Sequence, residues 1–235
     1  MDCWICGDIA DTKEHKIKAS DLAQHFGVIT QEDPAVRWPK DQRKQYIKSK
    51  KSPKFTFDSL ICGSCNNDRT QPYDKSWESL SKYFFDNRDR HIRDGVWEPK
   101  KAFPGSSKRN MLNVHLYFIK WFGCKARDLG VNLDYSVLSN NILNSDYNSN
   151  FYLVFGNTPG LPSDMKYALE TPIDVLEYGS DKNIHSAFSF YIVGQVAIKI
   201  VYTPGANFRT LVKGAWSPDD KRSKYIYFEK SDVKI

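Results

Sequence analysis

The stretch Cys62-Gly63-Ser64-Cys65 and the stretch Cys3-Trp4-Ile5-Cys6 each place two cysteines three positions apart. A single tight turn can present both thiolates of such a pair, and the small residues between positions 62 and 65 suit that turn. Together the two pairs supply four sulfur ligands, which is the ligand set of a tetrahedral structural zinc site. Four thiolates leave no open coordination position, so we expect this Zn²⁺ to hold the fold and the chemistry to lie beside it.

The cysteine count is odd, because Cys124 is left over from the two pairs. In a reducing compartment this pattern indicates metal binding before disulfide bonding, and two unrelated redox-active or buried pairs are the alternative. The first residues carry charge and hold no apolar run of signal-peptide length. The longest apolar stretches, 114–124 and 188–202, are interrupted by lysine or glutamine and fall short of the roughly 20 residues that span a bilayer. We therefore expect a cytoplasmic protein without a membrane segment.

The composition, 40% hydrophobic and 26% charged over 235 residues, is typical of a folded protein, and the net charge of +6 favours a polyanionic partner. The composition changes near residues 103–109, where a proline, a glycine and two serines interrupt regular structure. We expect two domains, 1–104 and 108–235. In the second, hydrophobic spacing predicts an amphipathic helix over 110–129. Apolar and aromatic runs predict strands at 151–155, 186–193, 195–202, 209–215 and 224–229, with Gly194 in a tight turn.

Between the cysteine pairs lies the dipeptide Glu14-His15, and Asn66 directly follows the second pair. In this order, over about residues 1–80, the motifs resemble the zinc-knuckle subtype of the HNH endonucleases, which are also called ββα-metal or His-Me finger nucleases. The resemblance implies an N-terminal ββα-metal domain that carries the four-cysteine zinc site. The helix and strands expected after residue 108 predict a C-terminal α+β domain with a mainly antiparallel sheet, so the fold class is α+β.

Carried over to this chain, the resemblance makes Glu14 and Asn66 ligands of a catalytic Mg²⁺ or Mn²⁺. It makes His15 the general base that takes a proton from the attacking water, and the products would carry a 5′-phosphate and a 3′-hydroxyl. Hard cations take carboxylate and amide oxygens, and a histidine with an ordinary pKa of about 6.5 can accept a proton near neutral pH. We expect the Glu14 carboxylate and the Asn66 amide to converge within one metal ion's reach, with His15 facing the same cavity. The alternative is a surface acid, a solvated histidine and a helix-capping asparagine.

The chain departs from the family pattern at one position. The family has an asparagine a few residues before the second cysteine pair, where it helps to orient the histidine, whereas this chain has Asp58 and Ser59 there. Asp58 is therefore the candidate for orienting His15. Arg69 follows Asn66 by about one helical turn, where it can grip the scissile phosphate or remain a solvated charge.

A basic tract between the cysteine pairs is the candidate nucleic-acid surface. Residues 37–54 hold eight basic side chains against one acid, and such a tract binds phosphates without reading sequence. A solvated charged helix is the alternative interpretation. The eight residues are Arg37, Lys40, Arg43, Lys44, Lys48, Lys50, Lys51 and Lys54.

The leading hypothesis is a metal-dependent HNH endonuclease that cleaves phosphodiester bonds of DNA rather than RNA, in bacterial restriction or anti-phage defence. The C-terminal domain would select the substrate, sense a signal or bind a partner protein, and a homodimer would allow a double-strand break. One alternative is a non-catalytic zinc-finger module that binds nucleic acid. Another is a homing or packaging nuclease with the same chemistry and a different target.

Overall fold

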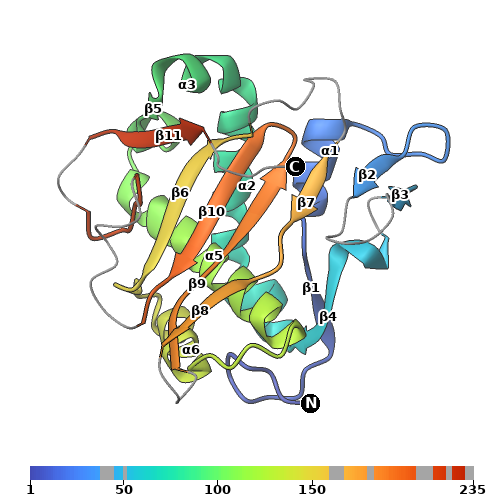
Figure 1. The fold of residues 1–235 in the computed structure, drawn as a ribbon, viewed down its shortest axis with the longest axis vertical. Helices are drawn as coiled ribbons and strands as arrows, with labels where there is room; N and C mark the ends of the chain where they lie inside the picture. Colours follow the sequence, from blue (N-terminus) through green and yellow to red (C-terminus); the bar gives the residue numbers. More distant parts are fainter. Residues whose placement is uncertain are drawn as a thin grey trace.

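A computed structural model describes residues 1–37, 45–49, 52–158, 167–178, 183–204, 214–220 and 224–230. Within these residues the fold is α+β and the largest sheet is mainly antiparallel, as expected. Helices α2 (Gln71–Asp86) and α5 (Ser107–Asp128) lie behind one face of this sheet (Figure 1). None of the described helices has the length and apolar content to cross a membrane.

The strands of the main sheet are β5 (Val96–Trp97), β6 (Phe151–Asn157), β7 (Ala168–Glu170), β8 (Asp174–Tyr178), β9 (Asn183–Val193), β10 (Val196–Tyr202) and β11 (Ile226–Lys230). They lie in the order β5-β11-β6-β10-β9-β7, and β8 pairs with β9 on the same side as β7. The pairing of β11 with β6 is parallel, and the other pairs are antiparallel. The strands expected at 151–155, 186–193, 195–202 and 224–229 are confirmed as β6, β9, β10 and β11, with Gly194 in the turn between β9 and β10. The strand expected at 209–215 falls largely outside the described residues.

Helix α5 matches the helix expected at 110–129, but it is more deeply buried than an amphipathic pattern implies. Every residue from 113 to 126 is buried, including Lys120 and Lys125. A helix that is covered on all sides lies in a core. The reason is that the sheet, α2 and the N-terminal strands each pack against a different side of α5.

The N-terminal part is built from short elements around two antiparallel strands. Strand β1 (Thr12–His15) pairs with β4 (Thr56–Ile61), and the second cysteine pair then leads into the wide helical turn η2 (Ser64–Arg69) and α2. Pro72 lies in the first turn of α2, where a missing N–H costs nothing. The remaining elements are α1 (Ala19–Phe26), β2 (Ala35–Arg37), β3 (Gln45–Ile47), η1 (Pro53–Phe55), α3 (Arg88–Asp94), α4 (Pro99–Ala102) and α6 (Tyr135–Asn144).

One continuous hydrophobic core runs through the described residues on both sides of positions 104–108. It includes Trp77 from the first part and Phe118 and Tyr191 from the second, whose rings are in edge-to-face contact. Strand β5 also adds to the sheet from before the expected boundary, by pairing with β11. The division into independently folding domains stays a prediction, and the packing across it is tight.

Asp21 is a buried carboxylate within this shared core, and the effect of burial on its pKa can be tested. Its carboxylate is 1% exposed and accepts hydrogen bonds from the Trp77 indole, at 2.9 Å, and from the Tyr191 hydroxyl. Burial raises the pKa of Asp21, and these hydrogen bonds only partly oppose that rise.

We compare the free energy of unfolding of the protein with that of an Asp21→Asn variant. We expect the protein to lose stability relative to the variant as the pH rises from about 4. The folded state keeps a proton on Asp21 at pH values where the unfolded chain has lost it, so raising the pH favours unfolding. The asparagine keeps an acceptor for both donors and does not titrate. Urea unfolding at several pH values measures the difference. Asp89→Asn, at a side chain 87% exposed, is the control, and a difference that stays constant with pH would contradict the assignment.

Candidate zinc site and the charged cluster beside it

The four paired cysteines come together at one point. Their sulfur atoms all lie within 4.8 Å of one another, and Cys6 Sγ is 3.4 Å from Cys62 Sγ. Zinc–sulfur bonds of about 2.3 Å in a tetrahedron place sulfurs about 3.8 Å apart, so the cluster has the size that zinc requires. Three of the four are buried. The four cysteines therefore fit a structural zinc ion. The alternative of two unrelated cysteine pairs is wrong, because the two pairs lie together.

Backbone geometry forms each knuckle. In the first, Gly7 N–H donates to the Cys3 carbonyl at 2.8 Å, and Gly7 has a φ of 85°, which favours glycine. In the second, the Cys65 N–H donates to Cys62 Sγ at 3.3 Å. These turns are the local reason that two cysteines three positions apart face the same point.

Helix α5 packs against the first knuckle. The ring of Trp4 lies so close to Gly123 that a Cβ at this position would be 2.4 Å from a ring carbon. The Trp4 indole also donates to Cys124 Sγ at 3.4 Å. The cysteine outside the two pairs thus has a packing role beside the zinc site.

Glu14 and His15 lie on β1, at an irregular position of its pairing with β4. Lys13 pairs with Leu60 and His15 pairs with Thr56, so the register shifts at Glu14. Such a bulge changes the direction of a side chain. Glu14 is 4% exposed and points into the protein, whereas His15 is half-buried. Burial lowers the pKa of His15, which favours the neutral imidazole that a general base needs.

The partner of Glu14 is Lys120, from the middle of α5. Lys120 Nζ lies 2.8 Å from Glu14 Oε2 and 3.0 Å from Asp74 Oδ1, and its side chain is fully buried. Burial alone would raise the pKa of Glu14, but the charge and hydrogen bond of Lys120 lower it overall. Likewise the two carboxylates raise the pKa of Lys120 against the effect of burial. Glu14 and Lys120 therefore form a charged pair, whereas burial and the charge of Glu14 raise the pKa of Asp74.

A second lysine completes this charged cluster. Lys18 Nζ is 3.4 Å from Asp74 and 3.1 Å from Glu78. Thr70, which is also buried, accepts a hydrogen bond from Lys120 at 3.1 Å. We call Glu14, Lys18, Asp74 and Lys120 the charged cluster.

Asn66 connects the start of the helical segment to β1. Its Nδ2 donates to Thr12 Oγ1 at 3.2 Å and to the Lys13 carbonyl at 3.3 Å. A carbonyl can only accept, so the amide nitrogen must face β1 and the amide oxygen must face away from it. The Asn66 side chain thus lies beside the peptide group that precedes Glu14.

The site offers oxygen atoms of the type that a divalent cation requires. Glu14 keeps Oε1 when Oε2 is paired with Lys120, and Asn66 keeps Oδ1. These donors fit Mg²⁺ or Mn²⁺ in kind, but the neighbouring ammonium of Lys120 would repel a cation. That the two side chains converge on one ion stays a prediction.

The remaining predicted site residues are exposed. Asp58 is 86% exposed at its side chain, and its carboxylate pairs with Lys13 at 2.9 Å, which lowers its pKa. Arg69 is exposed at the end of η2. Their predicted roles, orienting His15 and gripping a phosphate, stay predictions.

Part of the basic tract lies within the described residues. Arg37 ends β2, and Lys48 and Lys54 are exposed. Residues 45–47 form strand β3, so the charged-helix alternative is wrong for these residues, because they pair with β2. The other predicted residues, Lys40, Arg43, Lys44, Lys50 and Lys51, lie outside the described residues.

Sequence reasoning missed Lys120 as a site residue. The signal was a lysine within the apolar run 114–124, where an unpaired charge would be costly and a partner is therefore required. Its partner Glu14 is more than a hundred positions away, so the sequence could not identify the pair.

Comparison with protein families, with curated proteins and with solved structures found no match. The resemblance to HNH endonucleases therefore rests on the residues of this chain alone.

Proposed function

We propose that the protein is a metal-dependent HNH endonuclease that hydrolyses phosphodiester bonds of DNA. The observation that carries the proposal is the position of Asn66. Its amide, at the start of the helical segment that follows β4, is hydrogen-bonded to β1 one residue before Glu14. Two antiparallel strands, a cysteine-stapled turn and a helical segment thus place Asn66 beside the strand that carries Glu14 and His15.

The proposed chemistry assigns a different task to each side chain. Glu14 Oε1 and Asn66 Oδ1 would hold Mg²⁺ or Mn²⁺, which when bound stabilises charge on the phosphate and the leaving oxygen. His15, kept neutral by burial, takes the proton from the attacking water. Lys120 holds Glu14 Oε2, which fixes the orientation of the carboxylate. The four cysteines keep β1 and the helical segment together.

A His15→Ala variant should lose DNA cleavage by at least about a hundredfold, because general-base catalysis contributes that much or more. The measurement is cleavage of plasmid DNA, linear DNA and RNA with Mg²⁺ or Mn²⁺. His25→Ala, a histidine of α1 outside the charged cluster, is the matched control, with the melting temperature of each variant as a check of folding. Equal cleavage by the His15→Ala variant and the unmodified protein would exclude His15 as the base.

A non-catalytic zinc-stapled module that binds nucleic acid is the second candidate. It is favoured by the Glu14–Lys120 ion pair, since a carboxylate that is 4% exposed and already neutralised has a structural role without any metal ion. The same experiment separates the two functions. This candidate predicts that DNA is retained in a gel-shift assay but is not cleaved with either cation.

Restriction or anti-phage defence is the biological setting that we propose for a DNA nuclease of this kind, with homing or DNA packaging as the other settings. Double-strand cleavage by a chain with one active site would require a dimer or a partner protein. Sedimentation with and without DNA tests that requirement.

A further inference from the structure

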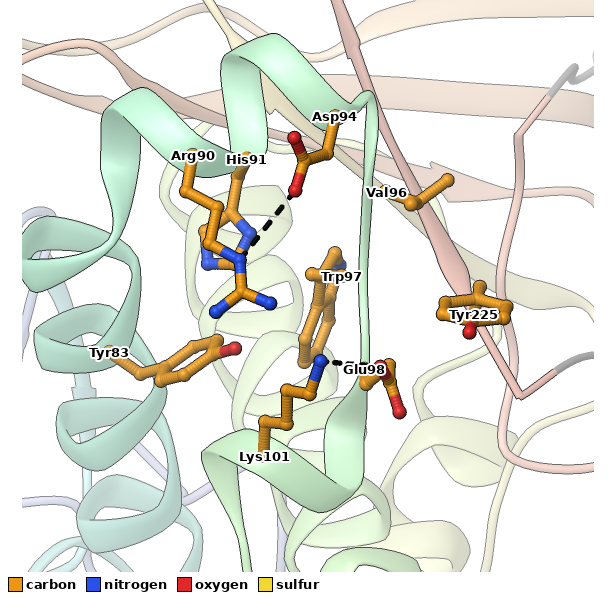
Figure 2. Close-up of a pocket in the computed structure, with 9 residues that line it drawn as sticks. All are labelled: Tyr83, Arg90, His91, Asp94, Val96, Trp97, Glu98, Lys101 and Tyr225. Atoms are coloured by element: carbon orange, nitrogen blue, oxygen red, sulfur yellow. Dashed lines mark ion pairs between the residues drawn. The ribbon is translucent and has the colours of Figure 1, made fainter.

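A pocket lies at the opposite end of α2 from the zinc site. Its volume is about 200 Å³, and its walls come from α2, α3, β5, α4 and the residue just before β11 (Figure 2). Drug-sized ligands fill larger pockets. The size therefore suits one small ring system with a polar substituent.

Aromatic side chains form the floor and the sides of this pocket. Trp97 is 2% exposed and lies at the floor, while Tyr83 and Tyr225 are only partly covered and lie on opposite sides in Figure 2. Aromatic faces favour a planar ligand, because stacking adds to the burial of apolar surface.

Unsatisfied polar atoms gather at the same place. Both ring nitrogens of His91 and the indole nitrogen of Trp97 are buried without a hydrogen-bond partner among the described residues, and both side chains line this pocket. The backbone of Val96 lies near His91, but not in normal hydrogen-bond geometry. Burial lowers the pKa of His91, so the ring is neutral and offers one donor and one acceptor, and Trp97 offers a donor. A ligand with both acceptors and donors would satisfy these atoms.

Positive charge surrounds the opening. In Figure 2 the Arg90 guanidinium points into the space between Tyr83 and Trp97. Its Nε lies 3.6 Å from Asp94, which leaves the two terminal nitrogens of the guanidinium fork for a ligand. Glu98 is paired with Lys101 at 2.6 Å and with Lys224 at 3.0 Å. Three cations against two carboxylates favour an anionic group at the opening.

We propose that this pocket binds one nucleotide unit. The planar base lies against the Tyr225 ring and forms hydrogen bonds with Trp97 and His91 at the floor. The phosphate lies at the opening, on Arg90 and Lys101. The unit is either a free nucleoside monophosphate or one nucleotide of a nucleic-acid strand, since both present the same base and phosphate.

Calorimetric titration of the full chain with the ribo- and deoxyribonucleoside 5′-monophosphates, without added divalent cations, tests the proposal. We expect saturable binding of at least one of them and a loss of about tenfold or more in affinity in an Arg90→Ala variant, the effect of losing a charge-assisted hydrogen bond. Arg93→Ala is the matched control, because Arg93 is on the same helix, is 72% exposed and does not line the pocket. Lys101→Ala should likewise weaken binding of the monophosphate, and Lys100→Ala is its matched control.

A second pair of variants tests recognition of the base. Tyr225→Ala should weaken nucleotide binding and leave the binding of inorganic phosphate unaffected. Tyr227→Ala, two residues further on in β11 and outside the pocket, should change neither. Displacement of the bound monophosphate by a single-stranded oligonucleotide would identify the strand as the source, and lack of displacement would identify the free nucleotide.

Three results would overturn the proposal: no monophosphate binds, inorganic phosphate binds as tightly as the monophosphates, or Arg90→Ala binds as tightly as Arg93→Ala. Because binding is measured without a cation and without cleavage, a failure of the proposed nuclease activity leaves this test unaffected.

Discussion

Replacing Cys65 with serine should remove the zinc ion and lower the melting temperature by about 10–20 °C, the shift that corresponds to about 5 kcal/mol in a domain of this size. The reason is that a structural zinc ion contributes its binding free energy to folding, and a four-thiolate site needs all four ligands. Cys65 is buried and lies within η2, directly before Asn66. Loss of the ion would release the first knuckle from the second.

The measurement is the zinc content of the purified protein together with its thermal unfolding. Cys124→Ala is the matched control, because this cysteine is also buried and lies near Trp4, but it is outside the four-sulfur cluster. It should retain one zinc ion per chain and show only the smaller loss that comes from packing. A Cys65→Ser protein that keeps its zinc and its melting temperature would show that the four cysteines are not a structural metal site.

The features that the sequence predicted correctly have short-range causes. Cysteines three positions apart form a knuckle wherever the chain places them, and the hydrophobic spacing from Leu112 to Phe122 depends only on the geometry of one helix. Strands β6, β9 and β10 are runs of apolar and aromatic residues, with Gly194 between the last two. Patterns of this kind are local, so they can be identified before any tertiary contact is known.

The features that the sequence did not predict depend on contacts between distant residues. Nothing near Val96 indicates that β5 joins the sheet beside β11, and nothing near Phe228 indicates that β11 lies parallel to β6. The burial of α5 on all sides likewise depends on which elements surround it. The same distinction applies to the candidate site. The motif predicts Glu14, His15 and Asn66, whereas Lys120, which pairs with Glu14, lies more than a hundred residues from it in the sequence.

Replacing Lys120 with methionine should destabilise the protein by about 3–5 kcal/mol, the cost of leaving a buried carboxylate without its partner. Methionine keeps much of the volume of the lysine and removes the charge. Glu14, at 5% side-chain exposure, and Asp74, at 16%, would both lose their nearest cation. Lys108→Met, at an exposed lysine of the same helix, should change the free energy of unfolding by no more than about 0.5 kcal/mol.

A double-mutant cycle with Glu14→Gln separates the ion pair from the loss of packing. If the pair is the cause, the Glu14→Gln/Lys120→Met protein should be more stable than the sum of the two single changes predicts, because the second change removes the charge that the first left unpaired. Additive effects, measured by urea unfolding, would mean that Lys120 stabilises α5 through packing and not through Glu14.

The same variants test whether Glu14 can hold a catalytic cation. Without the ammonium of Lys120, the Glu14 carboxylate loses its direct ion-pair partner. Mn²⁺ should therefore raise the melting temperature of Lys120→Met more than that of the unmodified protein, as a ligand of the folded state does. Addition of Glu14→Gln should abolish that gain. A gain that persists in the double variant would place the cation elsewhere. No gain in either protein would favour the non-catalytic module, in which the buried carboxylate of Glu14 serves only to pair with Lys120.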